Sequence, residues 1–136
     1  VAYQGYVGGA RESSAKSNHA STVKYIAAEL QKCAIGESEV MKKGTQKLTC
    51  ASTYAADTIA SAAAVALSDF KNPYDTDAAA VNSTGTATAS TDKGYVRVIA
   101  SSNTLTITTC FDNSTDTSGS DCSVAADRVE NTVDVN

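Results

Sequence analysis

Small and apolar residues recur at helical spacing along the first quarter of the chain. Over residues 1–35 they keep to one face of a helix, and this face is strongly apolar only after Ala20. Gly36 then suits a left-handed C-terminal cap. The pattern predicts one long amphipathic helix that ends just before this glycine. Its apolar positions beyond Ala20 are Val23, Ile26, Ala27, Leu30, Cys33 and Ala34.

A second helix is predicted in a connecting region that spans residues 36–82. The start of this region, residues 37–49, is polar and charged, and we interpret it as a loop that can begin with a short helical turn. Ser52 or Thr53 can cap a helix that runs to about Phe70. The rest of the region contains the only proline and is interpreted as a surface connection. Apolar positions at helical spacing are Ile59, Ala62 or Ala63, Ala66, Leu67 and Phe70.

The spacing of apolar residues changes to two in residues 83–136. Four segments alternate β-branched or aromatic residues with polar ones, and the short separators between the first three indicate antiparallel hairpins. The segments are residues 86–90, 95–101, 104–110 and 128–136. The order of elements predicts the α+β class, with the long helix before an antiparallel sheet of about four strands. The expected inner-face residues are Tyr95, Val96, Val98, Ile99, Leu105 and Ile107, with Val129, Val133 and Val135 on one side of the last strand.

The composition allows only a thin hydrophobic core. The 136 residues fit a single domain, but 23 of them are Ala, and Leu, Ile, Val and Phe together supply only another 23. With a net charge of only −4, the chain lies near the border between globular and disordered compositions. We therefore expect an additional source of stability, and the cysteines are the obvious candidates.

Four cysteines in a small, Ser/Thr-rich, mildly acidic chain are typical of a disulfide framework made outside the cytosol. Spacing favours the pairs Cys33 with Cys50 and Cys110 with Cys122, because both close short loops. Each bond is expected to contribute about 3 kcal/mol. A zinc site would need more closely spaced cysteines or a Cys/His cluster, and the only histidine, His19, lies on the first predicted helix.

The acidic loop closed by the last two cysteines raises the alternative of a calcium site. Asp112, Asp116 and Asp121, with Ser and Gly between them, offer oxygen ligands. The loop departs from the EF-hand template, which places a glycine sixth and a glutamate twelfth. A solvated, turn-rich loop is therefore the favoured interpretation, and we predict no metal site.

The sequence contains no recognisable catalytic constellation. Neither a nucleophile with an assigned base, nor a GxSxG motif, nor a phosphate-binding glycine loop is present, and His19 is interpreted as a surface or packing residue. We expect no enzymatic activity and no cofactor. Eleven basic residues against 15 acidic ones, without a basic run, also argue against broad nucleic-acid binding.

The opening stretch, VAYQGYVGGARESSAKSNHASTVKYIAAELQKC, resembles type IV pilins just past their hydrophobic start. In that family a segment similar to AYQGY leads from the membrane-spanning half of the first helix into its amphipathic half. The order of a long helix, a variable connecting region, a sheet of about four strands and a disulfide-bounded C-terminal loop agrees with the family along the whole chain. The second helix and the 14 residues after Cys122 depart from its plainest members.

The resemblance implies that residues 1–136 are a pilin head domain that lacks the apolar N-terminal half-helix. That missing segment would anchor the subunit in the inner membrane before assembly. The subunit would then polymerise with copies of itself and with other pilins into an extracellular fibre for adhesion, twitching motility or DNA uptake. Cys110 and Cys122 would bracket the surface-exposed D-region. The residues expected to project from the head and to contact neighbouring subunits are Tyr3, Tyr6, Val7 and Ala10.

Two other functions stay open at this point. A pseudopilin of a type II secretion system shares the helix and the sheet, and its major form resembles a calcium-binding version of the same head. A minor pilin at a fibre tip would act as a binding module for a surface ligand, with Lys42, Lys43 and Lys47 as candidate basic residues. The two predicted disulfides favour the structural pilin over the pseudopilin, and calcium binding would discriminate between them.

Overall fold

One long helix, a shorter helix and three sheets make up the part of the fold that the structure describes. In this computed structural model, the residues described are 2–50, 56–85, 87, 92–111, 122 and 128–135, with side chains from Ala10 onward. The elements are α1 (Ala2–Ala34), β1 (Glu39–Lys43), β2 (Gln46–Thr49), α2 (Ala56–Ala66), β3 (Lys71–Asn72), β4 (Asp75–Ala79), β5 (Val81–Asn82), β6 (Val96–Ser101), β7 (Thr104–Cys110) and β8 (Arg128–Asp134). The α+β class and the N-terminal helix are therefore confirmed.

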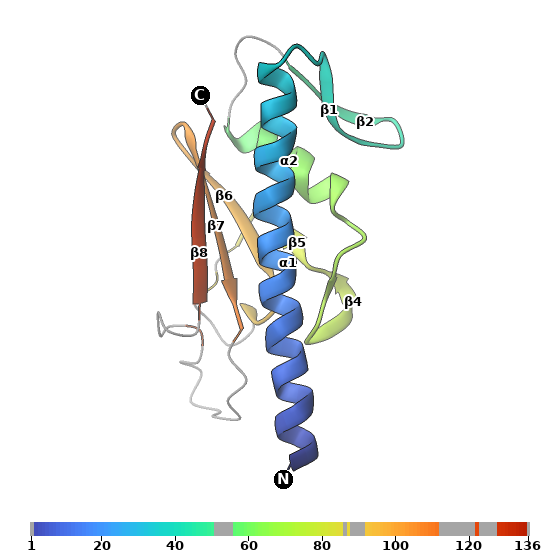
Figure 1. Ribbon diagram of the computed structural model, residues 1–136, viewed down its shortest axis with the longest axis vertical. Helices are drawn as coiled ribbons and strands as arrows, with labels where there is room; N and C mark the ends of the chain where they lie inside the picture. The colour runs from blue at the N-terminus through green and yellow to red at the C-terminus, as the bar shows by residue number, and fades with distance from the viewer. Residues whose placement is uncertain are drawn as a thin grey trace.

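Helix α1 runs along the whole length of the molecule and packs on the largest sheet (Figure 1). That sheet has the strand order β5-β6-β7-β8. Helices α1 and α2 cover the same face of it, because their buried side chains join one core cluster with the inward-facing residues of β6 and β7. Those inward-facing residues are Val96, Val98, Leu105 and Ile107. Apart from the buried Cys110, the described residues on the other face of β6, β7 and β8 are half-buried or exposed.

The predicted C-terminal cap of the first helix is confirmed. Gly36 has a φ of +109°, a conformation that a residue without Cβ adopts at little cost. Its N–H donates to the Cys33 carbonyl, and the Glu37 N–H donates to the Lys32 carbonyl over 3.0 Å. This pair of hydrogen bonds is the Schellman motif, which satisfies carbonyls that the end of a helix leaves free. The helix therefore ends where the sequence places its cap.

The interpretation of residues 37–49 as a loop is wrong, because β1 and β2 form an antiparallel hairpin there. Its alternation is hidden by a bulge between Val40 and Lys43. Met41 has a φ of +52°, and as a result Val40 and Met41 are both buried although they are adjacent in sequence. A single inserted residue of this kind breaks the period of two that identifies a strand.

Helix α2 and the turn after it bury most of the residues predicted for the second helix, while Ala66 and Phe70 are only half-buried, and the helix is shorter than predicted. Ile59, Ala62, Ala63 and Leu67 are buried, while the helix ends at Ala66 and a turn carries the chain to Phe70. In that turn the hydrogen bonds tighten from four residues apart to three, as in the bond from the Phe70 N–H to the Leu67 carbonyl. The predicted caps at residues 52 and 53 lie outside the described residues.

Residues 71–82 are not a plain surface connection, which corrects a second prediction. They form the β3–β4 hairpin and then β5, which pairs with β6 in parallel. Strands of two residues, such as β3 and β5, are too short to show alternation, so the sequence pattern missed them. The large sheet is antiparallel only from β6 to β8, and most of the strand predicted at residues 86–90 lies outside the described residues.

The strands β6, β7 and β8 match the three later alternating segments. One part of the predicted inner face is wrong: Ile99 is only half-buried because it pairs with Thr106 and points to the face opposite Val98. Strict alternation prevents the neighbours Val98 and Ile99 from sharing a face. Tyr95, just before β6, is half-buried as well.

Both predicted disulfides are confirmed. Cys33 and Cys50 join the end of α1 to the end of β2, across 17 residues of sequence. Cys110 and Cys122 join the end of β7 to a buried position 12 residues later. Each bond therefore fixes the end of an element that carries core residues.

Candidate functional site

The N-terminal turns of α1 are the place where the sequence predicts contacts with neighbouring subunits. The helix begins at Ala2, and in Figure 1 its first turns extend past the ends of all the labelled strands. Ala10 is exposed, as predicted. The side chains of Tyr3, Tyr6 and Val7 lie outside the described part, so their exposure stays a prediction.

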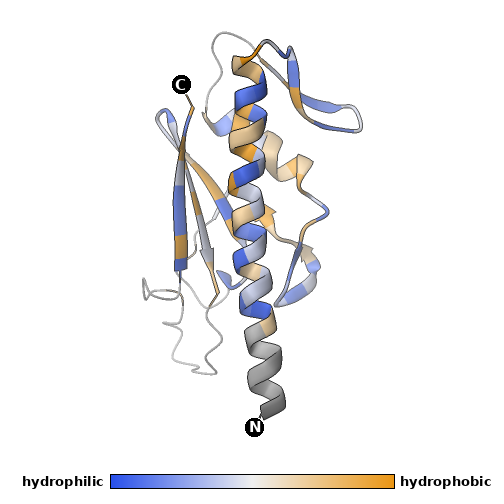
Figure 2. Cartoon of the chain, in the orientation of Figure 1, coloured by the Kyte–Doolittle hydropathy of each residue, from blue (hydrophilic) through white to orange (hydrophobic). Residues whose placement is uncertain are grey.

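The outward face of α1 carries mostly small side chains. Figure 2 shows that hydrophobic residues become frequent only in the C-terminal half of the helix. Such a face lets another helix approach closely, because little side-chain volume separates the two backbones. The exposed small residues are Ala10, Ser13, Ser14, Ser17, Ala20, Ser21, Ala27, Ala28 and Ala34, and the longer exposed side chains between them are Arg11, Lys16, Lys24, Gln31 and Lys32. The prediction that Ala27 and Ala34 lie on the apolar face is therefore wrong, because both are exposed.

On the inward face of α1, His19 is the centre of a buried polar cluster. Its residue surface is 3% exposed. The ring Nδ1 lies 2.8 Å from Thr109 Oγ1 on β7, and Nε2 lies 2.8 Å from Asn131 Oδ1 on β8. The sequence left open whether His19 is a surface residue or a packing residue. Its burial shows that it is a packing residue. No local pattern could have found its partners, which are 90 and 112 residues away.

A second buried polar contact attaches the β1–β2 hairpin to α1. Glu29 is 7% exposed, and its Oε1 accepts the backbone N–H of Met41 over 2.8 Å. Lys32 pairs with its other oxygen. Burial alone would raise the pKa of Glu29, but Lys32 and the Met41 amide stabilise the carboxylate and hold its pKa below the usual range. Burial and the nearby Glu29 raise the pKa of Tyr25 to about 12.

Replacing Glu29 tests how much this contact contributes. Glu29→Ala should lower the free energy of unfolding by about 2 kcal/mol, because the buried Met41 N–H loses its acceptor. Glu29→Gln keeps an acceptor oxygen and loses only the pairing with a half-exposed lysine, so it should cost less than about 1 kcal/mol. Urea unfolding at neutral pH measures both. Equal losses for the two variants would contradict this role of the carboxyl oxygen.

The candidate basic residues do not form an open cationic patch. Lys43 Nζ lies 3.0 Å from Asp69, and Lys47 pairs with Glu39. Lys42 is exposed on β1. Two of the three charges are thus neutralised by neighbouring carboxylates, which lowers their attraction for an anionic ligand.

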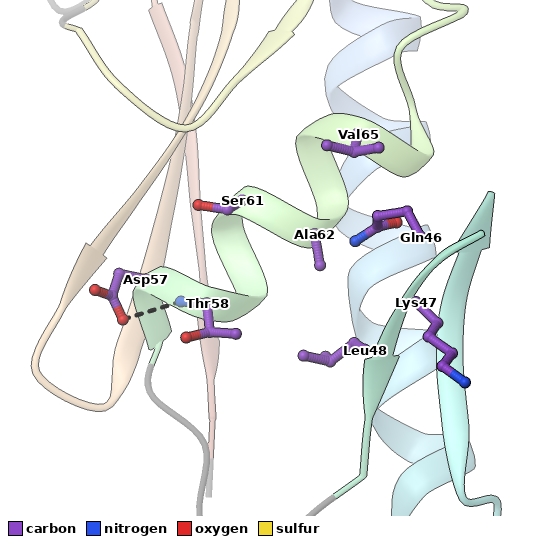
Figure 3. Close-up of a pocket in the computed structure, with 8 residues that line it drawn as sticks. All are labelled: Gln46, Lys47, Leu48, Asp57, Thr58, Ser61, Ala62 and Val65. Carbon is purple, nitrogen blue, oxygen red and sulfur yellow. Dashed lines mark hydrogen bonds between the residues drawn. The ribbon is translucent and has the colours of Figure 1, made fainter. Parts of the chain in front are cut away.

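A shallow groove lies between α2 and β2, with a volume of about 360 Å³. Leu48, Thr58 and Ala62 converge in it, whereas Lys47 points away from α2 (Figure 3). Oδ1 of Asp57 accepts the Thr58 N–H over 2.9 Å within its own helix. The groove therefore offers hydroxyl and amide groups above an apolar floor, and its lining includes no nucleophile with a neighbouring base.

The predicted alternative of a calcium loop cannot be located, since Asp112, Asp116 and Asp121 lie outside the described residues. Within the described ranges, no three His, Cys, Asp or Glu side chains gather in a way that could hold a metal ion. Neither described helix combines the length and apolar composition that crossing a bilayer requires.

Comparisons with protein-family models, with curated proteins and with solved structures found no match to this chain. The resemblance to type IV pilins was drawn from the opening residues and the order of elements, and it stays a prediction.

Proposed function

We propose that this chain is the head domain of a type IV pilin, a structural subunit that polymerises into a cell-surface fibre. In this proposal α1 carries the contacts between subunits, and the sheet and the hairpins form the surface of the fibre. The subunit is held in the inner membrane before assembly and becomes extracellular afterwards. It needs no cofactor and performs no chemical step.

The observation that carries the proposal is the shape and surface of α1. Its 33 residues span roughly 50 Å, and its first turns lie beyond the sheet (Figure 1). A helix end that extends past its own sheet is available for contacts with another molecule. The small residues of its outward face favour close packing of many parallel copies.

The disulfides support the same proposal. A thin core stabilised by two disulfides suits a protein that works outside the cytosol, where disulfides persist. The ligand-binding alternative has less support, because Lys43 and Lys47 already pair with carboxylates. A pseudopilin remains the closest competitor, and calorimetric titration of the purified domain with Ca²⁺ tests it: calcium binding would favour the pseudopilin.

Placing a large charge on the exposed start of α1 tests assembly directly. Ala10→Arg should abolish fibre formation by the full-length protein, because repeated copies would bring like charges together in the packed helices. The melting temperature of the isolated head should not change, since Ala10 is exposed and Arg is a good helix former. Electron microscopy of sheared surface material, with antibody labelling of this chain, measures assembly.

Ser101→Arg is the matched control, because Ser101 is exposed and is the last residue of β6. The turn between β6 and β7 lies far from the start of α1 (Figure 1). It should leave fibre formation intact. Normal fibres from Ala10→Arg, or surface fibres that never contain the wild-type chain, would overturn the proposal.

A further inference from the structure

The two halves of α1 are attached to the rest of the protein in different ways. From Ile26 onward the helix is held by a fully buried isoleucine, by the Glu29 contact to the hairpin and by the Cys33–Cys50 disulfide. In the segment from Ala10 to Thr22, here called the lower segment, the buried side chains are only Ala15, His19 and Thr22. Little apolar area holds the lower segment in place.

Polar contacts therefore decide whether the lower segment stays on the sheet. Asn18 Nδ2 donates to the Lys71 carbonyl over 3.2 Å at an exposed position, and Lys16 Nζ lies 4.3 Å from the centre of the Phe111 ring. Thr22 Oγ1 donates to the Asn18 carbonyl within the helix itself. His19 supplies the contact with two strands: its hydrogen bond with Thr109 is buried, and its hydrogen bond with the exposed Asn131 is partly buried.

The surroundings of His19 suit a neutral imidazole. Asn131 Oδ1 can only accept, so Nε2 carries the proton and donates it, while Nδ1 accepts from the Thr109 hydroxyl. Both ring nitrogens are thus satisfied without charge. A second proton on Nδ1 would place a cation in this buried position, and the Thr109 hydroxyl would have to turn its own hydrogen away and accept from the ring instead.

Among the residues that the structure describes, charged groups offer little compensation for that cation. β7 contains no ionisable side chain except the disulfide-bonded Cys110. On β8 the charged residues alternate with Asn131 and so point to the opposite face of the sheet, where Glu130 accepts from Thr108 and Asp134 accepts from Thr104. Arg128 on β8 and Arg97 on β6 also point to that opposite face. On α1, Lys16 and Glu12 lie about one and two turns before His19 and pair with each other, and the Lys71 backbone carbonyl bonds to the neighbouring Asn18.

We propose that His19 is a pH-sensitive latch, in which protonation of the imidazole releases the lower segment of α1 from β7 and β8 while the segment from Ile26 to Ala34 stays attached. Release exposes the ring to water, where the imidazolium is solvated. The proposal concerns the head alone and holds whether or not the chain assembles into fibres.

The direction of the pH effect follows from the burial. Desolvation lowers the pKa of His19 below 6.5, and the hydrogen bond with Asn131 offsets this only in part. The released state therefore binds more protons than the attached state as the pH falls below 6.5. The equilibrium constant for attachment is highest above that pH. As the pH falls, this constant decreases by up to about tenfold per pH unit, until the pH reaches the pKa of His19 in the attached state.

Hydrogen exchange of backbone amides, followed by NMR, tests the latch in the whole domain. Protection factors corrected for intrinsic exchange are compared between about pH 7.5 and about pH 5, the range in which histidine is the side chain that titrates. We expect protection in residues 15–22 to fall by about tenfold or more and protection in residues 26–33 to change less than about twofold. Because His19 is the only histidine, its ring signals report the pKa in the same sample.

Two variants complete the test. His19→Gln removes the titrating group and should abolish the pH response of residues 15–22. Adding Gln31→His to that variant restores a histidine at an exposed position of α1 and should restore no response. The proposal is overturned if wild-type protection falls equally in both halves of the helix, if it does not fall at all, or if His19→Gln keeps the wild-type response. The wild-type comparison alone decides the matter should the variants fail to fold.

Discussion

Replacing Gly94 with alanine is expected to be among the most damaging single changes, with a loss of more than about 3 kcal/mol in the free energy of unfolding. The φ of Gly94 is +80°, and a Cβ there would lie 2.0 Å from Asn72 Oδ1 and 2.7 Å from Tyr74 Cδ2. Asn72 is 1% exposed and cannot turn aside freely. Its Oδ1 accepts the Tyr74 N–H and its Nδ2 donates to the Lys93 carbonyl, each over 2.8 Å.

Gly44→Ala provides the matched control for this prediction. Gly44 also has a positive φ, of +60°, but a Cβ there would meet nothing within 4 Å. The Gly44→Ala variant should lose only about 1 kcal/mol in the free energy of unfolding, because the substitution adds backbone strain without a clash. Urea unfolding of the two variants separates the clash from the strain. If the two losses are equal, the contact between Gly94 and Asn72 does not govern stability.

Removing both disulfides is expected to have the largest effect of any change considered for this chain. Loops of 17 and 12 residues correspond to about 3 kcal/mol each, or about 6 kcal/mol together. That sum reaches the total stability of many small domains. The variant with alanine at all four cysteine positions should therefore be largely unfolded at neutral pH, as far-UV and near-UV circular dichroism would report.

Each pair can also be removed alone. The Cys33→Ala/Cys50→Ala variant and the Cys110→Ala/Cys122→Ala variant should remain folded and lose about 3 kcal/mol each in urea unfolding. Alanine is chosen instead of serine because Cys110 and Cys122 are fully buried, where burying a serine hydroxyl would add a cost of its own. A four-alanine variant that unfolds at the same urea concentration as the wild type would refute the claim that the core needs these bonds.

The elements that the sequence predicted well are those with long, regular patterns. The first helix shows its apolar spacing over several turns, and β6, β7 and β8 each show six or seven alternating residues. The pairing of the cysteines was predicted from the short length of the loop that each pair closes. In each case a local pattern carries enough repeats to outweigh chance matches.

The elements that the sequence missed are short or irregular. The bulge at Met41 hides the β1–β2 hairpin, and β3 and β5 have only two residues each. Their pairing depends on distant partners, such as Val96 beside Val81. A pattern of two residues cannot distinguish a strand from a turn.

The buried polar contacts form a third group. Nothing near His19 in the sequence indicates Thr109 or Asn131, because only the packing of α1 on the sheet brings them together. Glu29 did carry a signal, since it interrupts the apolar stripe between Ile26 and Leu30. A carboxylate in such a position indicates a buried partner, which the structure identifies as the Met41 amide.

The two covalent loops also limit how far the chain can be drawn out by tension. When the ends of an oxidised molecule are pulled apart, the residues inside each loop add no contour length, because the load crosses from sulfur to sulfur. Together the loops of 17 and 12 residues withhold roughly 90 Å of extension. A molecule under tension thus stops lengthening well before its whole polypeptide is extended. The residues inside the loops can extend only after the disulfides have been reduced.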